Sequence, residues 1–582
     1  MKFAAALLVA LLAAAPHANA DSAGVSPLSA DILTGKSPYA GPVPLAAYAM
    51  PFGAAPAQTE FKGRLRFAVA PADAHAKLLL DRWKIATPGQ EFRQPPAFDF
   101  GFVPVNGHLV PVERGIVPAA GDWWDWIVGP GRTWQDGDSG WSRASVPFAL
   151  IEKNANCMHH GLLTFRYRGD AEVSRVAYQV SHETCYYFQF DAWGTAAATR
   201  VADPGIDKPA VSVAYRIEVS RRLPVKPIEQ ISKDYPGLDS GSFGSKEDID
   251  PRDMTVFGVF IRGVHYSGGC ETRRGRYPYC DEMPLPSYSL AKTLMAGLAL
   301  MRAEALHPGA RNLLITDYVP ECRAAGGWDG VTFENLLDMA SGHYESPKSE
   351  ADEDASNTGR FFIATTHAEK IQFACTHYPR KDPPGTRWVY HTSDTYILGA
   401  ALTAWWKKEK GPEADFYRDL LVVPVFKRLG LSPELATPRR TVDDAAQPFT
   451  GWGLVLRRDD LAKLGGYFAL GDGKLGKDML FDAAMLRAAM QRDPADTGLP
   501  ATDKNYRYNN GVWALNLAEK LGCKNPAWIP FMSGFGGISV VMMPNRVVYY
   551  YVSDGGKFSW SRAVAETNRI RTVCRDEKPN DG

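Results

Sequence analysis

An apolar run with helical spacing begins immediately after Ser289. Its apolar residues recur at intervals of three or four positions, at Leu290, Leu294, Leu298 and Met301. This spacing predicts a buried helix. Lys292 follows Ser289 by three positions, and residues three apart share a helix face. We therefore expect the lysine nitrogen to reach the serine hydroxyl, as an activated nucleophile requires.

The start of this helix offers a further chemical group. A backbone N–H in the first turn has no intrahelical acceptor, so the N–H of Ser289 is a candidate oxyanion donor. The alternative is a surface serine and lysine on an ordinary core helix, since the spacing is expected roughly once or twice by chance in a chain of this length. Taken alone, the pair favours that alternative.

Length and charge set broad limits. The 582 residues are enough for two or more domains. Lys plus Arg and Asp plus Glu both number 65. This balance gives no electrostatic reason to expect binding to nucleic acid or to an anionic membrane surface.

The first twenty residues have the pattern of a signal peptide. Lys2 precedes an apolar stretch over residues 3–15, and Ala18-Asn19-Ala20 has the small-x-small form cut by signal peptidase. The alternative is a retained membrane anchor, but the stretch is too short to span a bilayer comfortably. No later stretch is long and apolar enough to span. We expect a periplasmic or secreted chain whose mature form begins at Asp21.

The cysteines are predicted to form disulfides. There are eight, and an oxidising compartment favours pairing. Joining sequence neighbours is the simplest arrangement, although sequence cannot fix connectivity: Cys157 with Cys185, Cys270 with Cys280, Cys322 with Cys375, and Cys523 with Cys574. We predict no metal site, because no Cys-x-x-Cys occurs and the adjacent His159 and His160 would point to opposite faces of a strand.

The first half of the chain predicts a domain made of strands. Residues 21–60, rich in Ala, Pro and Gly, predict an extended N-terminal arm. Apolar and polar residues then alternate, as half-buried strands require, over 163–167, 176–180 and 211–219. Residues 61–225 are therefore expected to form an all-β domain, a sandwich. Residues 226–253 are polar and broken, and predict a linker that partly wraps onto the next domain.

A dense group of tryptophans lies within the expected β domain, at Trp123, Trp124, Trp126, Trp134 and Trp141. It is either an aromatic platform for a flat ligand such as a sugar, or core and loop packing. We favour packing, because tryptophan is highly buried on average.

Residues 254–582 predict an α/β domain. A strand, a turn at Arg262-Gly263 and a second strand are expected over 254–266. Helical segments are expected around 332–339, 394–408, 416–428, 459–467 and 482–490. A strand over 547–552 and a closing helix over 559–573 follow. Strands at both ends indicate a sheet that joins distant parts of the chain.

Tyr390 is the candidate for a second proton carrier. It ends a short extended segment just before a predicted helix. A phenol beside a lysine ammonium has its ionised form favoured, so Tyr390 is a candidate general base. A packed tyrosine with His391 incidental fits the spacing equally well.

Several segments in order resemble one family. Ser289-x-x-Lys292 at a helix start, then Pro-Gly-Thr, Tyr390 and a Leu-Gly pair, resemble the serine β-lactamase and penicillin-binding-protein superfamily, and more narrowly the class C β-lactamase-like hydrolases. The segments 332–342 and 453–462 are similar to further conserved stretches of that family. The resemblance covers about residue 254 to the C-terminus. It implies an antiparallel sheet flanked by helices with a helical subdomain, a catalytic trio of Ser289, Lys292 and Tyr390, and no cofactor or metal.

The third motif of the family departs from its usual form. Where Lys-Thr-Gly or His-x-Gly is usual, this chain has Ser533-Gly534-Phe535-Gly536. Gly534, Phe535 and Gly536 are expected to line the site, and an N–H near Phe535 to complete the oxyanion hole. The missing cation argues against substrates that carry a carboxylate beside the scissile bond, as penicillins and terminal D-Ala peptides do.

A second departure lies beside Tyr390. Thr392 stands where class C enzymes usually have asparagine, and with His391 it is a candidate substrate-binding residue. This pattern resembles the 6-aminohexanoate-dimer hydrolase and esterase branch. The sequence thus predicts an exported serine hydrolase acting on a small-molecule ester or amide. The alternatives are a β-lactamase or D-Ala carboxypeptidase, and a catalytically silent cell-envelope binding protein.

Overall fold

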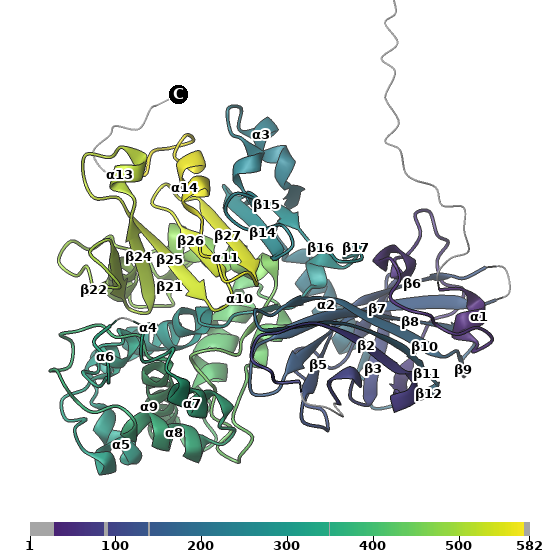
Figure 1. Ribbon diagram of the computed structural model, residues 1–582, viewed down its shortest axis with the longest axis horizontal. Helices are drawn as coiled ribbons and strands as arrows, with labels where there is room; N and C mark the ends of the chain where they lie inside the picture. The colour runs from purple at the N-terminus through teal and green to yellow at the C-terminus, as the bar shows by residue number, and fades with distance from the viewer. Residues whose placement is uncertain (1–27, 87–90, 138–139, 349, 575–582) are drawn as a thin grey trace, which may run out of the picture.

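The computed structural model describes residues 28–86, 91–137, 140–348 and 350–574. The predicted signal peptide, residues 1–20, lies outside the described residues. Two parts lie side by side in Figure 1: an N-terminal sheet, coloured purple to blue, and a larger C-terminal part, coloured teal to yellow. This is the expected order of a β-rich part followed by a mixed α/β part.

Twelve strands form the N-terminal sheet in the described part of the chain. They are β1 (Gly63–Phe67), β2 (Ala74–Asp81), β3 (Phe98–Val105), β4 (His108–Pro111), β5 (Trp124–Val128), β6 (Gly131–Gln135), β7 (Ser142–Glu152), β8 (Met158–Arg168), β9 (Glu172–Val173), β10 (Val176–Thr184), β11 (Phe188–Ala196) and β12 (Ala198–Val201). All neighbours are antiparallel. Ten strands follow the order β12-β1-β3-β4-β6-β7-β8-β10-β11-β2, while β5 pairs with β7 and β9 pairs with β8.

The sheet curls until its two sides meet, instead of forming the two layers of the predicted sandwich. β12 continues β11 after one residue and pairs with β1, while β11 pairs with β2, the strand that follows β1. Alternation along each strand sends one set of side chains inside. Phe100, Trp126 and Phe165 are among the aromatic residues that fill this interior. Trp124, Trp126 and Trp134 are buried, which agrees with packing as the role of most of the tryptophan group.

The alternating segment 211–219 is a helix, so the prediction of a strand there is wrong. Helix α2 spans Lys208–Ser220 and is capped by the Asp207 side chain, which accepts from the N–H of Ala210. Val211 and Tyr215, one helical turn apart, pack against the outside of β3 and β4. Val213 and Ile217 face solvent. The apparent alternation therefore arose from apolar residues on the exposed face of a helix.

Residues 28–62, which precede β1, contact the N-terminal sheet. This segment contains α1 (Ala30–Leu33) and a 3₁₀ turn over Leu45–Tyr48. Tyr39 and the backbone of Val43 hydrogen-bond to Gln179, which lies on the outer face of β10. Because this face is covered, β10 is buried on both sides.

Nine strands form the second sheet in the described residues, in the order β13-β15-β14-β27-β26-β25-β24-β23-β22. They are β13 (Val225–Pro227), β14 (Met254–Ile261), β15 (Val264–Gly269), β22 (Leu499–Ala501), β23 (Tyr506–Asn509), β24 (Val512–Asn516), β25 (Trp528–Gly534), β26 (Ile538–Met542) and β27 (Val548–Ser553). Only β13 runs parallel to its neighbour. The pairing of β14 with β27 confirms that this sheet joins distant parts of the chain.

Helices cover this sheet and build a separate layer below it in Figure 1. Helix α11 (Arg458–Leu470) packs on β14, β26 and β27. The lower group contains α5 (Pro320–Ala325), α6 (Phe333–Leu337), α7 (Gly359–Ile363), α8 (His367–Thr376) and α9 (Thr392–Lys410). The helix after Ser289 consists of a π-helical stretch over Lys292–Gly297 and α4 (Leu298–Leu306). A second π-helical stretch spans Tyr417–Phe426, and α10 (Lys427–Leu429), α12 (Ala483–Ala489), α13 (Ala518–Leu521) and α14 (Ser561–Thr567) follow. The expected helices are thus present, with the closing helix shorter than predicted.

The predicted linker, 226–253, takes part in the second sheet and its core. Its first residues belong to β13, and a short helix α3 (Ile231–Asp234) follows. Ile231, Phe243 and Ile249 are buried against the sheet. The segment therefore packs along its length onto the C-terminal part.

Buried ion pairs join the two parts. Six charged side chains form an interdomain charge cluster: Arg114, Glu218, Arg222, Glu282, Glu434 and Arg457. Arg457 lies at its centre, 2.8 Å from Glu218, 2.6 Å from Glu282 and 2.7 Å from Glu434. A second buried pair links Arg439 to Asp125 of β5.

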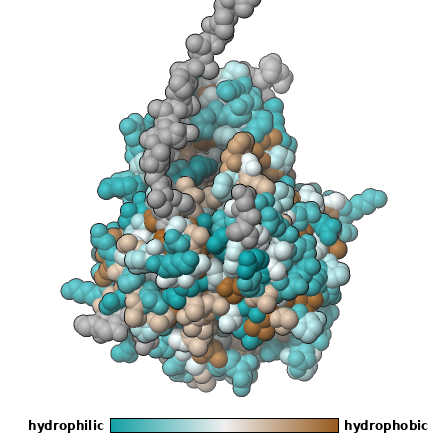
Figure 2. All heavy atoms as spheres, turned by 90° about the vertical axis from the view of Figure 1, so that its right-hand side faces the viewer, coloured by the Kyte–Doolittle hydropathy of each residue, from teal (hydrophilic) through white to brown (hydrophobic). Residues whose placement is uncertain are grey.

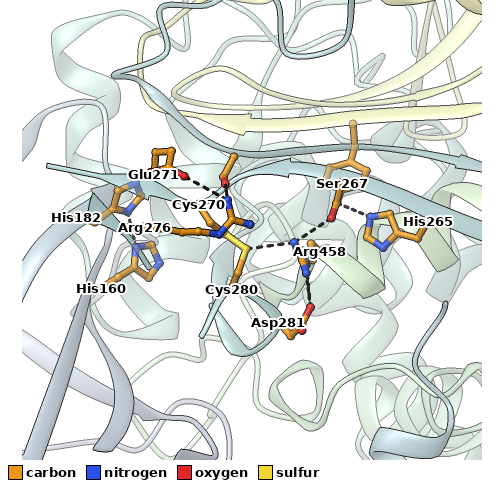
Figure 3. The surroundings of a disulfide bond; sticks show 12 residues. His160, His182, His265, Ser267, Cys270, Glu271, Arg276, Cys280, Asp281 and Arg458 are labelled. Carbon is orange, nitrogen blue, oxygen red and sulfur yellow. Dashed lines mark hydrogen bonds and ion pairs between the residues drawn. A yellow bond between two sulfur atoms is a disulfide. The ribbon is translucent and has the colours of Figure 1, made fainter. Parts of the chain in front are cut away.

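All four predicted disulfides are present. The Cys270–Cys280 bond lies where the two parts meet, with His160 and His182 of the N-terminal sheet on one side and Arg458 of α11 on the other (Figure 3). Arg458 donates to Ser267 at 3.0 Å and to the Cys280 sulfur at 3.2 Å. This disulfide therefore closes the loop over residues 270–280, directly after β15, at the boundary between the two parts.

The surface is mixed in character. Figure 2 shows polar side chains over most of the end formed by the N-terminal sheet, with apolar atoms scattered between them. None of the helices among the described residues combines the length and the apolar character needed to cross a bilayer.

Candidate active site

Ser289 lies on a sharp turn between a strand and a helix. Strand β18 (Leu285–Pro286) pairs with β19 (Val455–Leu456), and the helix begins after Ser289. Tyr288, in the turn, has a φ of 39°, a left-handed conformation that is uncommon for a residue with a side chain. The turn leaves Ser289 half-buried while its neighbours are buried. The nucleophile candidate is therefore the accessible residue of an otherwise closed segment.

Lys292 reaches the Ser289 hydroxyl as expected. Its Nζ lies 2.8 Å from Ser289 Oγ, 2.8 Å from Thr392 Oγ1 and 3.3 Å from the carbonyl oxygen of Gly451. The lysine is 2% exposed. Burial lowers its pKa to about 8, and the nearby Glu353 opposes this shift. A substantial neutral fraction therefore exists near pH 8, and a neutral amine can accept the serine proton.

Tyr390 contacts the same hydroxyl from another side. Its OH donates to Ser289 Oγ at 2.9 Å, and its ring lies 4.9 Å below the Lys292 nitrogen and stacks on Trp513. Burial raises the pKa of Tyr390 well above its usual value, and the charge of Glu353 adds to the rise. This direction argues against the expected ionised phenol, because desolvation disfavours the charged form. Tyr390 is held as a proton donor.

Glu353 is a member of this site that the sequence did not single out. Its carboxylate accepts hydrogen bonds from both the N–H and the hydroxyl of Thr392, at 3.0 Å for the N–H. Thr392 in turn contacts Lys292. Glu353 belongs to the acidic run Glu350–Asp354, and nothing in that run marks which carboxylate turns inward. Thr392 is 2% exposed, and its hydroxyl links Glu353 to Lys292.

His391 does not face the site. It is 1% exposed, its Nε2 lies 3.0 Å from Asp352 Oδ2, and its ring stacks on Tyr378. Its placement contradicts the expected contact with substrate, because the side chain points into the helical layer. There it fixes the loop that carries Asp352 and Glu353.

The glycine-rich turn lies beside Ser289. Strand β25 ends at Gly534, where a Cβ would lie 2.8 Å from the Ser287 carbonyl oxygen and 3.5 Å from Tyr288 Cβ. Only a glycine permits so close an approach. Phe535 follows with 40% of its surface exposed, and Gly536 has a φ of 87°. Within the described residues, the N–H groups of Ser289 and Phe535 donate to no other residue. Both are thus available to an oxyanion.

Three residues that carry metal-ligand atoms lie close together outside this site, but two of them are bonded to each other. Cys157, His159 and Cys185 place ligand atoms within 4.8 Å of one another. The two cysteines are joined as a disulfide, so they offer no thiolate. His160 and His182 contact each other through Nδ1 atoms 3.1 Å apart.

The chain is similar to known proteins in two comparisons. The family model described as Beta-lactamase matches residues 257–557. A comparison with curated protein sequences gives no match. Similar solved structures include a putative 6-aminohexanoate-dimer hydrolase from Bacillus anthracis (14% identity, TM-score 0.42, covering 60% of this chain and 87% of that one). They also include a family VIII carboxylesterase (19% identity, TM-score 0.41, covering 60% of this chain and 98% of that one). A class C beta-lactamase is similar as well (15% identity, TM-score 0.38, covering 65% of this chain and 99% of that one).

The family assignment follows from the family match alone. The matched segment contains Ser289, Lys292, Tyr390 and the turn after β25, and it spans more than half of the chain. The protein therefore belongs to the beta-lactamase family, whose members are serine hydrolases.

Proposed function

We propose that the protein is an exported serine hydrolase that cleaves an ester or amide bond through an acyl-enzyme on Ser289. The observation that carries this proposal is the convergence of two side chains on one hydroxyl. Lys292 Nζ lies 2.8 Å and Tyr390 OH 2.9 Å from Ser289 Oγ. A nucleophile flanked by a base and a proton donor at hydrogen-bond distance is what acyl transfer requires.

The first half of the reaction uses all three groups. Neutral Lys292 takes the proton of Ser289 while Oγ forms a bond to the substrate carbonyl carbon. The N–H groups of Ser289 and Phe535 donate to the carbonyl oxygen, which becomes negatively charged. The bond to the leaving oxygen or nitrogen then breaks. Lys292 returns the proton to that atom, directly or through the hydroxyl of Tyr390.

Water completes the cycle. It attacks the acyl carbon and gives one proton to Lys292, and the bond to Ser289 Oγ then breaks. Ser289 recovers its proton from Lys292, and the acid is released. Tyr390, which stays protonated, stabilises the developing charge on Ser289 Oγ by its hydrogen bond. Every proton removed is returned, so the residues end as they began.

The residues at the end of strand β25 favour an ester or amide substrate over a β-lactam substrate. Its last residues, Phe531-Met532-Ser533-Gly534, contain no Lys, Arg or His to bind a substrate carboxylate. A site that lacks a partner for such a charge loses a charge-assisted hydrogen bond. The four disulfides support export, because disulfides persist in oxidising compartments.

A panel of p-nitrophenyl esters and p-nitroanilides tests this proposal, with Ser289→Ala as the control variant. We expect turnover of at least one substrate class. We also expect a fluorophosphonate probe to add one phosphonyl group to the wild-type protein and none to Ser289→Ala. Turnover that survives in Ser289→Ala rules out the proposed nucleophile. Stable covalent capture of a labelled penicillin would instead point to a β-lactamase or carboxypeptidase, and inertness to every substrate and probe would point to a binding protein.

A further inference from the structure

We propose that Asn156, a residue of the N-terminal sheet, is a positioning residue for the nucleophile. This inference rests on the proposed function of Ser289. Asn156 lies in the loop between β7 and β8, far from the catalytic residues in sequence. It is fully buried among residues of the C-terminal part.

The β7–β8 loop is inserted into the C-terminal part and held at each position. Asn154 donates from Nδ2 to the carbonyl oxygens of Phe362 and Ala364, at 2.6 and 2.9 Å. The carbonyl of Ala155 accepts from Arg439 at 3.3 Å. The Cys157–Cys185 disulfide ties the end of the loop back to its own sheet. Asn156 is therefore presented by a loop that is anchored on both sides.

The Asn156 side chain binds the residue before the nucleophile. Its Oδ1 accepts from the N–H of Tyr288 at 2.7 Å and lies 3.2 Å from Ser287 Oγ. Tyr288 is the residue with the left-handed φ of 39°. Such a conformation persists only where its surroundings fix it. The hydrogen bond from Tyr288 to Asn156 fixes it here, and thereby sets the direction of Ser289.

The same amide also fixes the segment that contacts the base. Oδ1 accepts from the N–H of Gly453 at 3.2 Å, and Nδ2 donates to the carbonyl of Leu454 at 3.3 Å. Two residues earlier, the carbonyl of Gly451 accepts from Lys292 Nζ. One side chain thus links the backbone beside the nucleophile to the backbone beside its base. The Ser289–Lys292 distance depends on a residue outside the matched family region.

The test measures how fast a fluorophosphonate probe modifies Ser289, together with kcat and KM for the best ester, in the full-length protein. Asn156→Leu removes all these hydrogen bonds at similar volume. A displacement of about 1 Å at a reacting atom costs on the order of a hundredfold in rate. We therefore expect labelling rate and kcat to fall about a hundredfold with KM within threefold. Asn156→Asp keeps the acceptor oxygen and should restore part of the rate.

Asn545→Ala is the matched control, since it also removes two hydrogen bonds of a buried amide, to the carbonyls of Thr567 and Arg571, in the turn between β26 and β27. It should keep wild-type labelling and kcat within threefold, even where its melting temperature falls as far as that of Asn156→Leu. If Asn156→Leu does not fold, Asn156→Asp is compared with Asn545→Ala at equal folded fraction. Equal labelling rates of the Asn156 variants and the wild type overturn the inference. Absence of labelling in the wild type overturns the proposed nucleophile instead.

A separate observation concerns two exposed aromatic side chains, one from each part of the protein. We propose that Trp83 and Phe535 form a subsite for an apolar group on the substrate, a claim that also rests on the proposed function. Their ring centroids are 6.0 Å apart, and they are 55% and 40% exposed. Trp83 stacks on Tyr187, and Phe535 meets the ring of Tyr288 edge-on at 5.5 Å. Phe535 thus contacts Tyr288, the residue directly before Ser289, so one end of the aromatic pair lies next to the nucleophile.

Two probes that differ only in their apolar group test this subsite: a methylphosphonofluoridate and a benzylphosphonofluoridate. Trp83→Ala should lower the benzyl-to-methyl ratio of Ser289 labelling rates by about tenfold, as expected for losing one apolar contact surface. Phe52→Ala, at a fully exposed aromatic residue, is the control and should leave the ratio unchanged. An unchanged ratio in Trp83→Ala contradicts the subsite. A wild type that neither probe labels contradicts the nucleophile.

Discussion

Two buried lysines, Lys292 and Lys370, are similarly desolvated but contact different groups. Each is at most 2% exposed, and burial lowers the pKa of each, to about 8 for Lys292 and about 7 for Lys370. Lys370 lies on α8, donates to the carbonyl of Phe361, and has three aromatic rings within 5.1 Å. Lys292 has a half-buried serine beside it.

The difference teaches that a lowered pKa alone does not identify a catalytic base. Both amines are neutral for part of the physiological pH range because desolvation disfavours their charge. Only Lys292 is within hydrogen-bond distance of a hydroxyl that solvent can reach. Geometry therefore separates the two, and the following experiments test that separation.

The largest expected effect is on catalysis after removal of the base. Lys292→Met should lower kcat/KM at least about a thousandfold, because the serine then has no acceptor for its proton. Lys370→Met should keep kcat/KM within about threefold, since the Lys370 amine donates to the Phe361 carbonyl and makes no hydrogen bond to Ser289, Lys292 or Tyr390. Ester hydrolysis by both purified variants checks this. Comparable losses of kcat/KM in the two variants would show that contact with Ser289 does not distinguish the two lysines.

Removal of the Tyr390 hydroxyl should have the next effect. Tyr390→Phe keeps the ring against Lys292 and Trp513 but removes the donor to Ser289 Oγ. We expect a loss of about 10² to 10³ in kcat, the range of a positioned proton donor. Single-turnover kinetics measure it. A variant as active as the wild type would show that Lys292 alone moves the proton.

Lys370 should govern stability instead. Its folded pKa of about 7 lies below that of an unfolded lysine, so the unfolded chain binds a proton that the folded chain does not. Stability is therefore lost as pH falls from about 10.5 to about 7. Lys370→Met has no group that titrates in this way. Its free energy of unfolding, relative to that of the wild type, should therefore rise by about 3 kcal/mol when the pH is lowered from 9.5 to 6. Urea unfolding at both values tests the sign, and a constant difference would contradict it.

The pH profile should report Lys292 directly. The base must be neutral, so kcat/KM should fall tenfold per unit below about pH 8 and level off above it. At pH 6 the value should be about a hundredfold below the plateau. Rate measurements from pH 5.5 to 9.5 in buffers of constant ionic strength are sufficient. A profile that is flat, or that falls as pH rises through 8, is incompatible with this role.

The smallest effect concerns Glu353, whose charge raises the pKa of Lys292. Glu353→Gln should move the midpoint of the profile to lower pH, and raise activity at pH 6 by a few-fold relative to the plateau. Glutamine retains an oxygen for the N–H of Thr392. Asp354→Asn, at an exposed neighbour, is the control and should leave the midpoint in place. A midpoint that moves upward would reverse the assigned sign.

Local patterns predicted much of this molecule, and long-range placement accounts for the rest. Ser289 and Lys292 were identified together because helical spacing determines which residues meet, and the disulfide partners were sequence neighbours. The alternation over 211–219 predicts a strand wrongly, because a helix with exposed valines gives the same pattern. No local pattern predicts the roles of Glu353 and Asn156, because each reaches the site from a loop whose packing is set by long-range contacts.

The interdomain charge cluster has a consequence for cooperativity. Separating the N-terminal sheet and α2 from the C-terminal part would leave Glu434 without Arg114, Arg457 without Glu218, and Arg439 without Asp125, while each stays largely desolvated. Breaking buried ion pairs in this way costs several kcal/mol each. An intermediate with one part folded and the other melted is therefore disfavoured, and heating should give a single calorimetric transition. We therefore expect the two parts to behave as one thermodynamic unit, so that the C-terminal part cut out by itself does not fold stably.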